Sequence, residues 1–330
     1  MRVAFAGASH WHLPLYLEPL RRLDGIDLVG MADPDPDWAA ACRERHGCPG
    51  ETDLGTLLAR TRPDFVFALG QHADMARQAA ILIEAGIPFA LEKPCGLDAR
   101  EVSGIARQAE ARGSFAAVPL VLRNGGFLPH MNHRLADDPL HYASFRFVAG
   151  PPQRYRDTGC AWMLDPARAG GGALINLGVH FMDIARCWLP GAQTRVIASV
   201  MGNAAAGLPI EDYAAVTVSD GRRTVTVETG YLTPAATHQF DMHYAVDMAG
   251  GYVTVAGPGA VDIADRSGGR ETLAMPTTNV PLYEVFVADV LDRARSGRPP
   301  LAGLDAMAEA FGLIDQAYAM AAPFRVARPA

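Results

Sequence analysis

Five short runs of apolar residues alternate with amphipathic segments over the first 120 residues, and this alternation constrains the fold more than any other feature. The apolar runs cover residues 2–7, 27–33, 64–70, 88–94 and 114–122; helical spacing covers 12–23, 35–46, 53–60, 73–86 and 98–113, with Asp98 the expected N-cap of the last. Strands that are apolar throughout and alternate with helices indicate a parallel sheet covered on both faces. We therefore expect an α/β domain with a doubly wound parallel sheet, a fold that binds nucleotides.

The second half of the chain has a different periodicity. Apolar and polar residues alternate with a period of two at 141–150, 194–203, 212–231, 237–248 and 251–257, with Asp220-Gly221 at a hairpin turn. An apolar helix is expected at about 173–189 and amphipathic helices at 281–297 and 304–322. These patterns predict an α+β domain with a mostly antiparallel, open sheet. The domains are expected at residues 1–122 and 123–330, with the C-terminal helices packing back on the first.

Charge and cysteine content exclude several classes of protein. The net charge is −7, the pI is about 5.8, and no basic run occurs, which argues against nucleic acid or an anionic membrane as a partner. No apolar run reaches the roughly 18 residues of a membrane span. The first expected strand begins at Arg2, which leaves no room for a signal peptide. Five scattered cysteines are typical of reduced packing residues, so we expect a cytoplasmic protein.

A single lysine, Lys93, stands in the run Leu91-Glu92-Lys93-Pro94-Cys95-Gly96. The chain has 29 lysines and arginines, and one is lysine, so 28 are arginine. Arginine replaces lysine easily at solvated sites, but it cannot be deprotonated and its planar fork does not mimic a compact ammonium. Chance survival of one lysine is the alternative. The position favours function, because ligands gather at the carboxyl ends of strands in open parallel sheets, where Glu92-Lys93-Pro94 is expected.

The turn after the first strand resembles a dinucleotide-binding loop only in part. The fingerprint G-x-G-x-x-G has three glycines. In the corresponding segment here, residues 7–12, only the first is present, as Gly7; Ser9 and His12 stand at the other two positions. Asp33 ends the second strand 21 residues beyond His12, where a carboxylate binds the adenosine ribose and repels a 2′-phosphate. The alternatives are a plain β–α turn without a ligand, and Asp33 as the N-cap of the next helix. We expect a cofactor, NAD in preference to NADP.

A glycine triplet at 170–172 opens the expected helix at 173–189. Asn176, His180 and Asp183 follow at spacings of four and three, which places three polar side chains on one face of an apolar helix. Such groups are costly to bury without a purpose. Zinc binding by these residues, or by His130 and His133, is the alternative. No cysteine or glutamate completes a set at zinc spacing, so no metal is predicted.

These motifs resemble the Gfo/Idh/MocA family, which includes glucose–fructose oxidoreductase and inositol 2-dehydrogenases. The resemblance is carried by residues 84–94, 162–189, 32–37 and the segment 283–318, and the glycine-triplet helix with Gly178-Val179-His180 and Asp183 is its most specific part. It implies an N-terminal Rossmann domain and a C-terminal open-sheet domain that binds substrate and often forms oligomers, so a homodimer or homotetramer is expected. It also implies NAD(P)-dependent redox chemistry at a carbon of a sugar, polyol or cyclitol, with Lys93 and His180 at the reacting alcohol.

The sequence departs from the family pattern in three places. The glycine loop is degraded, Asn176 stands where the family often has Asp, and Gly70-Gln71-His72 stands where it commonly has T-P-N. The expected cofactor contacts are Gly7, Ser9, His10, Trp11, His12, Asp33, Gly70, Gln71, His72, Glu92 and Lys93. The expected substrate contacts are Lys93, Arg123, Trp162, Asn176, His180 and Asp183. Ordinary packing between the domains is the alternative for Arg123 and Trp162.

The chemistry of these residues suggests a mechanism with one open assignment. His180 is the expected base and Lys93 is expected to hold the substrate oxygen; a deprotonated Lys93 as the base, with His180 orienting the substrate, is the alternative. Asn176 is expected to position the substrate and Asp183 to orient His180 or cap a local network. Two other functions stay open: a sensor of nucleotide or sugar without turnover, and a redox-neutral sugar enzyme that recycles its NAD.

Overall fold

The first half of the chain forms a six-stranded parallel sheet, as the alternation predicts. The computed structural model describes residues 1–234 and 240–321. The strands are β1 (Arg2–Ala6), β2 (Asp27–Ala32), β3 (Gly50–Glu51), β4 (Phe65–Ala68), β5 (Phe89–Leu91) and β6 (Ala116–Ala117), in the order β3-β2-β1-β4-β5-β6. The two-residue strand β3 was not predicted, because it is too short to show periodicity.

Helices cover both faces of this sheet. They are α1 (Leu13–Leu20), α2 (Pro36–His46), α3 (Leu54–Thr61), α4 (Met75–Ala85) and α5 (Ala99–Ala111), with short 3-10 turns η1 (His72–Asp74) and η2 (Val121–Asn124). Asp98 caps α5 as expected, because its side chain accepts the backbone N–H of Glu101 at 2.8 Å. The cap of α2 is Asp35, so the alternative role of Asp33 as an N-cap is wrong.

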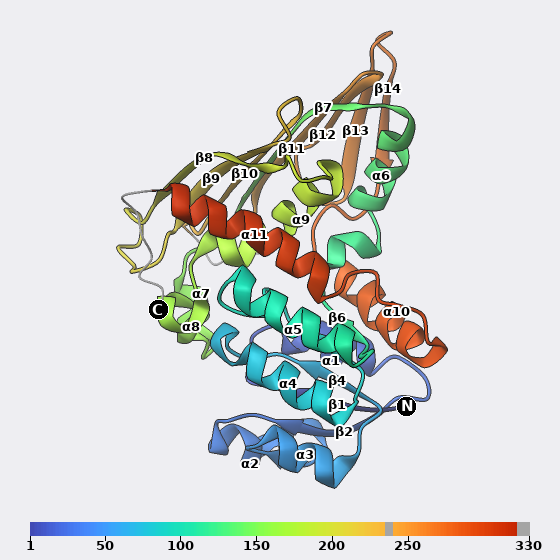
Figure 1. The fold of residues 1–330 in the computed structure, drawn as a ribbon, viewed down its shortest axis with the longest axis vertical. Helices are drawn as coiled ribbons and strands as arrows, with labels where there is room; N and C mark the ends of the chain where they lie inside the picture. The colour runs from blue at the N-terminus through green and yellow to red at the C-terminus, as the bar shows by residue number, and fades with distance from the viewer. Residues whose placement is uncertain (235–239, 322–330) are drawn as a thin grey trace.

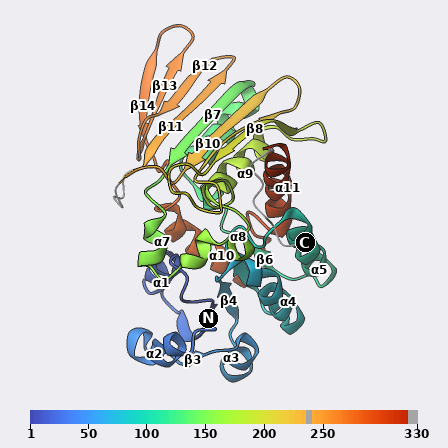
Figure 2. The same ribbon diagram turned by 90° about the vertical axis from the view of Figure 1, so that its left-hand side faces the viewer.

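The second half forms an eight-stranded sheet. Its strands are β7 (Leu140–Val148), β8 (Arg195–Gly202), β9 (Tyr213–Ser219), β10 (Thr224–Gly230), β11 (Asp241–Met248), β12 (Gly251–Val255), β13 (Ala260–Asp265) and β14 (Arg270–Ala274), in the order β14-β13-β12-β11-β7-β10-β9-β8 (Figure 2). Only β7 and β10 pair in parallel among these strands, so the predicted mostly antiparallel sheet is confirmed. Part of the expected strand at 237–248, residues 237–239, lies outside the described residues, and β13 and β14 were not predicted.

The remaining helical elements belong to the second half of the chain. These elements are α6 (Phe127–Asp137), α7 (Gln153–Asp157), η3 (Ala161–Leu164), α8 (Pro166–Ala169), a π-helical turn η4 (Leu174–Gly178), α9 (Val179–Trp188), α10 (Leu282–Ser296) and α11 (Leu304–Met320). The expected helix at 173–189 is thus a π turn followed by α9. The expected helix at 304–322 corresponds to α11, and its last expected residue, Ala322, lies outside the described residues. Within the described ranges, no helix has the length and apolar character needed to cross a membrane.

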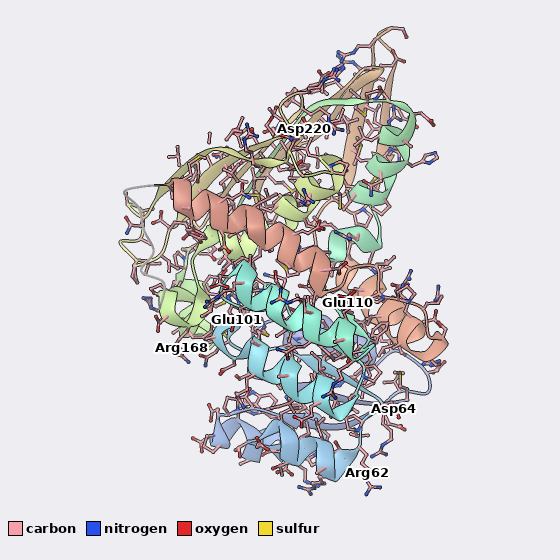
Figure 3. All side chains as sticks on the ribbon, in the orientation of Figure 1. Arg62, Asp64, Glu101, Glu110, Arg168 and Asp220 are labelled. Atoms are coloured by element: carbon pink, nitrogen blue, oxygen red, sulfur yellow. The ribbon has the colours of Figure 1, made fainter. Side chains whose placement is uncertain are left out.

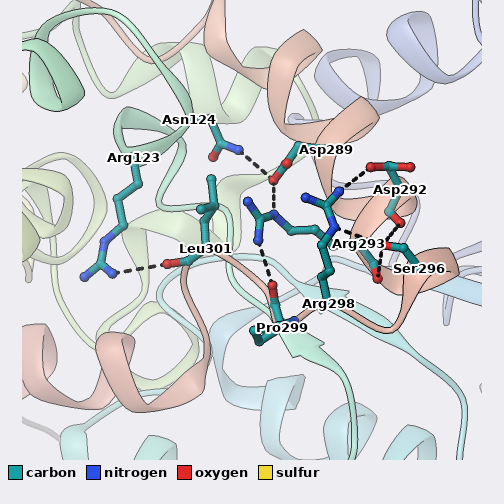
Figure 4. A network of polar contacts seen from close by, with 9 residues as sticks. All are labelled: Arg123, Asn124, Asp289, Asp292, Arg293, Ser296, Arg298, Pro299 and Leu301. Carbon is teal, nitrogen blue, oxygen red and sulfur yellow. Dashed lines mark hydrogen bonds and ion pairs between the residues drawn. The ribbon is translucent and has the colours of Figure 1, made fainter.

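The two C-terminal helices pack against both halves of the molecule. Helix α11 runs between the large sheet and α5, and it also contacts α9 and β8 (Figure 1). Helix α10 lies against α1 and η2. Polar contacts fix the end of α10: Arg293 donates to Asp289 Oδ2 at 2.7 Å and to the carbonyl oxygen of Pro299 at 2.9 Å, while Asn124 reaches Asp289 from η2 (Figure 4).

A buried ion pair ties η2 to helix α9. The Arg123 guanidinium donates from Nε to Asp183 Oδ2 at 2.9 Å and from Nη2 to Oδ1 at 2.6 Å. The Asp183 side chain is 2% exposed and the Arg123 side chain 23%. This planar, two-point geometry is the strongest form of ion pair. It commits both groups to holding η2, at the expected domain boundary, against α9.

The substitution Asp183→Asn should therefore affect stability. It leaves the Arg123 guanidinium without its carboxylate, and we expect a loss of about 2–3 kcal/mol in the free energy of unfolding. Urea denaturation measures it. Glu18→Gln, at an exposed position on α1, is the matched control and should change stability little. Equal midpoints for Asp183→Asn and the control would contradict a structural role for the pair.

Candidate active site

Lys93 lies directly after β5, and its ammonium crosses to the second half of the molecule. The residue is 3% exposed. Its Nζ donates to the backbone oxygen of Asn176 at 2.9 Å and to Asn176 Oδ1 at 2.8 Å. Burial lowers the pKa of Lys93 to about 8; neighbouring Glu92 opposes this shift and Arg154 adds to it. Near neutral pH this lysine can therefore both give and take a proton.

Asn176 is held in place by two tyrosines. Its Nδ2 donates to Tyr155 Oη at 2.6 Å and to Tyr231 Oη at 3.0 Å, so the amide oxygen must face Lys93. Asn176 lies in the π turn η4, a local geometry frequent at functional sites. The amide is neutral, so it accepts hydrogen bonds from Lys93 without adding a charge that would favour the ammonium.

Glu211 fixes the start of that turn. The fully buried carboxylate accepts the backbone N–H of Gly172 at 3.0 and 2.9 Å, the N–H of Leu174 at 2.9 Å and the hydroxyl of Tyr318 at 2.7 Å. A Cβ at position 172 would lie 2.0 Å from the carbonyl oxygen of Glu211, so only glycine fits there. The glycine triplet is thus needed for close approach of the chain.

His180 lies one turn beyond Asn176 and lines the same cavity as Lys93 and Asn176. The ring is 6% exposed, and neither ring nitrogen has a hydrogen-bond partner among the described residues. Burial, followed by the charge of Lys93, lowers the pKa of His180 to about 3. The imidazole is therefore neutral at pH 7, with one N–H donor and one acceptor free for a ligand.

Arg123, Asp183 and Trp162 do not line this cavity. Asp183 was expected to orient His180 or to cap a local network. Its carboxylate is bound by Arg123, so the first role is not seen and the contact is of the second kind. Trp162 instead packs against the first domain, with its ring 5.7 Å from that of His10 and 5.1 Å from that of His72. The helical spacing correctly grouped Asn176 and His180. It could not show that Asp183, one turn further along, meets an arginine of η2.

The loop after β1 has the close packing of a dinucleotide-binding turn. Gly7 has φ +61°, and a Cβ there would lie 2.2 Å from the carbonyl oxygen of Leu69. Gly70 has φ +122°. Ser9 is exposed, and its backbone N–H donates to Asp33 Oδ2 at 2.6 Å. The Asp33 carboxylate, 1% exposed, also accepts the N–H of Asp35 at 3.1 Å, so in this conformation it holds the loop itself.

Buried histidines and aromatic rings follow this loop. His10 and His12 are 5.1 Å apart between ring centroids, and Trp11 lies 3.8 Å from His12. His72 Nδ1 is 2.7 Å from the carbonyl oxygen of Ala169. Burial lowers the pKa of His10 and of His12 well below the ordinary value and that of His72 to about 4, so all three rings are neutral. The rings of His10, His12 and His72 therefore form an uncharged surface where the two domains meet.

Gln71 and Glu92 make further contacts beside these histidines. Gln71 Oε1 accepts a hydrogen bond from Arg168 Nε at 2.6 Å. Arg168, labelled in Figure 3, lies on α8, which contacts η1. Glu92 accepts the hydroxyl of Tyr16, and its other oxygen lies 3.3 Å from His12 Nδ1. Glu92 therefore faces α1, while the adjacent Lys93 faces Asn176.

Polar atoms without partners gather around Lys93. Thirteen buried side-chain nitrogen and oxygen atoms lack a hydrogen-bond partner in the described parts of the chain. Four of them belong to residues around this site: Trp11 Nε1, Arg154 Nε and both nitrogens of His180. Two more, His12 Nδ1 and Glu92 Oε1, lie 3.3 Å from each other. Buried polar groups are normally satisfied, so this concentration marks a place for a polar ligand. The tight turn at Gly7, the exposed Ser9 and these atoms fit a nicotinamide dinucleotide and a hydroxylated substrate.

No group of three or more histidine, cysteine, aspartate or glutamate side chains is arranged to hold a metal among residues 1–234 and 240–321. His130 and His133 lie on α6, and His133 is exposed.

Five residues of the site were missed in the sequence: Tyr16, Arg154, Tyr155, Glu211 and Tyr231. Tyr155 lies on α7, and Tyr231 directly follows β10. The two residues are 76 positions apart in the sequence, and the pairing of β7 with β10 brings them together. Glu211 is part of an acidic pair, Glu211-Asp212, at the start of the expected strand 212–231. A paired carboxylate at a strand boundary is a weak signal of a buried polar group, and it resembles an ordinary exposed turn.

The buried lysine should make stability depend on pH. Its pKa is about 8 in the folded state and about 10.5 when unfolded, so between these values the unfolded state binds more protons and stability rises with pH. The wild type should gain about 3 kcal/mol relative to Lys93→Met between pH 7 and pH 10.5. Urea unfolding of both proteins across this range measures it. Parallel stability curves would refute a depressed pKa for Lys93.

Comparison with known proteins places the chain in a family. Residues 1–119 match the model described as "Oxidoreductase family, NAD-binding Rossmann fold", and residues 139–253 match "GFO/IDH/MocA C-terminal domain". The putative UDP-kanosamine synthase oxidoreductase subunit of Amycolatopsis mediterranei is 30% identical over 200 residues, 60% of this chain. The match spans 54% of that relative, so about half of its length is compared.

Two solved structures show the same fold over nearly the whole chain. GenD2 from gentamicin A biosynthesis, in complex with NAD, superposes with a TM-score of 0.80 at 23% identity, covering 98% of this chain and 95% of that one. UDP-N-acetylglucosamine 3-dehydrogenase GnnA from Acidithiobacillus ferrooxidans gives 0.78 at 16% identity, with 98% of both chains covered. With both domain models matched in their expected order, the chain belongs to the Gfo/Idh/MocA family of oxidoreductases.

Proposed function

We propose that this protein transfers a hydride between a nicotinamide cofactor and a secondary alcohol carbon of a sugar, polyol or cyclitol. The observation that carries the proposal is the cavity in which Lys93, Asn176 and His180 converge beside Trp11. An ammonium with a pKa near 8 and a neutral imidazole are the groups that such a reaction needs. The names of the relatives, a synthase subunit for UDP-kanosamine and a dehydrogenase of UDP-N-acetylglucosamine, support a sugar as the substrate.

Lys93 is the better candidate for proton transfer. With a pKa of about 8 it takes the hydroxyl proton during oxidation and returns it during reduction. His180, with a pKa of about 3, is a weak base and serves to orient the substrate oxygen through a hydrogen bond. This assignment reverses the one expected from the sequence, because burial beside a cation suppresses the basicity of the imidazole.

The loop at Gly7–Ser9, Gly70-Gln71 and the Lys93 cavity would hold the cofactor, which when bound donates or accepts the hydride. Asp33, at the end of β2, favours NAD over NADP because a carboxylate repels a 2′-phosphate. The Ser9–Asp33 contact must open for the ribose to reach this carboxylate. The incomplete glycine fingerprint of the loop favours a second candidate, a sensor that keeps the fold without turnover.

Turnover separates the two functions. Purified protein is incubated with NAD or NADP and a panel of sugars, cyclitols and nucleotide sugars, and with the reduced cofactors and the corresponding ketones. Reduced nicotinamide is followed by absorbance, and cofactor binding by calorimetry. We expect NAD-dependent turnover with at least one member. Binding of NAD without any turnover, in either direction, would favour the sensor.

Lys93 should also control the pH dependence of that turnover. Oxidation should rise with pH through about 8, as Lys93 loses its proton, and reduction should fall over the same range. Asn176→Asp places a carboxylate beside the ammonium and should move the limb of the pH–rate profile, the rise in oxidation rate near pH 8, to higher pH. Lys93→Met should cost roughly 10²–10⁴-fold in rate and abolish the limb.

His180→Asn is the matched control, since it keeps a hydrogen-bonding side chain. It should retain the limb near pH 8 at a reduced rate. Loss of the limb in His180→Asn, with retention in Lys93→Met, would assign the proton to His180 and contradict the proposed role of Lys93.

A further inference from the structure

Arg154, on α7, is a cation without a carboxylate. Within residues 1–234 and 240–321, no aspartate or glutamate oxygen lies within ion-pair distance of its guanidinium. Its Nη2 donates to Tyr155 Oη at 2.7 Å, and its buried Nε has no partner. Three rings surround the guanidinium carbon, those of Tyr155, Tyr231 and Trp11, at 4.8, 5.5 and 5.9 Å from their centroids. Ring faces satisfy a cation only in part.

Arg154 lines a cavity of about 360 Å³ that lies beside the Lys93 site. The two cavities share Trp11, His12, Phe147, Leu177 and Asn279, so they are adjacent. The walls of the larger cavity are otherwise mostly apolar, with Leu15, Phe147 and Phe240 among them. An apolar pocket with one unpaired cation is suited to a ligand that carries an anion joined to a flat or apolar group.

Of the expected cofactor contacts, only Trp11 and His12 line this cavity. Neither Gly7, Ser9 and Asp33 nor Gly70 and Gln71 line it. Its walls come instead from the start of α1, from β7 and α7, and from residues 240 and 279–280. A ligand in this cavity would therefore extend from the reacting carbon away from the dinucleotide.

Hydrogen bonds connect Arg154 to the proton-transfer group. Tyr155 Oη accepts from both Arg154 Nη2 and Asn176 Nδ2, and Asn176 Oδ1 accepts from Lys93. The charge of Arg154 also lowers the pKa of Lys93. An anion bound at Arg154 would screen this charge, so occupancy of the larger cavity would be felt at Lys93.

Resting on the proposed function, we propose that the substrate is a nucleoside diphosphate sugar, with a phosphate bound by Arg154 and the nucleoside received between the apolar walls of this cavity. The sugar then lies at Lys93 and His180. The phosphate supplies the anion that the guanidinium lacks, and the planar base accounts for the aromatic walls, which a free sugar or an inorganic anion would leave uncovered.

Binding tests this without any need for turnover. Calorimetry with UDP, dTDP, uridine and inorganic diphosphate is performed on the wild type and on Arg154→Gln, Arg154→Lys and Arg156→Gln. We expect UDP or dTDP to bind better than uridine or diphosphate, and Arg154→Gln to weaken that binding roughly 10–100-fold. Arg154→Lys should be intermediate, because it keeps the charge and loses the planar fork. The exposed Arg156, on the same helix, is the matched control and should leave binding unchanged.

The outcomes separate this inference from the proposed function. Arg154-dependent binding of UDP or dTDP supports the anion site even if no sugar is oxidised, in which case the proposed function alone fails. Turnover of free sugars at the efficiency of nucleotide sugars, unchanged by Arg154→Gln, would overturn the inference and leave the proposed function standing. Equal binding of UDP by wild type and a folded Arg154→Gln, or tighter binding of diphosphate than of UDP, would also overturn it. Thermal denaturation checks that each variant is folded.

Discussion

The contact between Lys93 and Asn176 is the interaction on which the rest of the site depends. It joins the end of β5 in the first sheet to the π turn in front of α9, so it fixes the two halves of the cleft relative to each other. An ammonium taken out of water is costly, and two hydrogen bonds to a neutral amide residue do not neutralise its charge. The result is a lysine whose pKa lies close to neutrality. Burial of the ammonium therefore both lowers the stability of the folded protein and gives Lys93 a pKa suited to proton transfer.

Buried polar contacts elsewhere serve to hold this arrangement. Tyr155 and Tyr231 orient the amide of Asn176, and Glu211 fixes the start of the turn that carries it. The Arg123–Asp183 pair anchors the following helix from the other side. None of these groups needs to react. Together they keep the backbone of η4 and α9 where Asn176 meets Lys93 and where His180 faces the cavity, because a hydrogen-bonded network of buried polar groups makes its surroundings rigid.

Much of the fold could be predicted from the sequence, because hydrophobic periodicity records which face of each element is buried. Hydrophobic periodicity predicted both sheets. It did not predict β3, whose two residues are too few to show a period, and α6, β13 and β14 were also not predicted. For the site, Lys93, Asn176 and His180 were found because a rare residue and a helical spacing mark them. Tyr155, Tyr231 and Arg154 were not, since only the tertiary fold brings α7 and β10 together. Burial likewise decides the basicity of His180, and a sequence does not show it.

The protonation of Lys93 tests the account most directly. Since the chain has one lysine, protein labelled with ¹³C at the lysine ε carbon gives a single side-chain signal, whose shift can be followed with pH by NMR. A midpoint of about 8 is predicted for the folded protein, against the ordinary value of 10.5. A midpoint near 10.5 in the folded protein would mean that the ammonium is solvated, and the proposed proton transfer at this cleft would be contradicted.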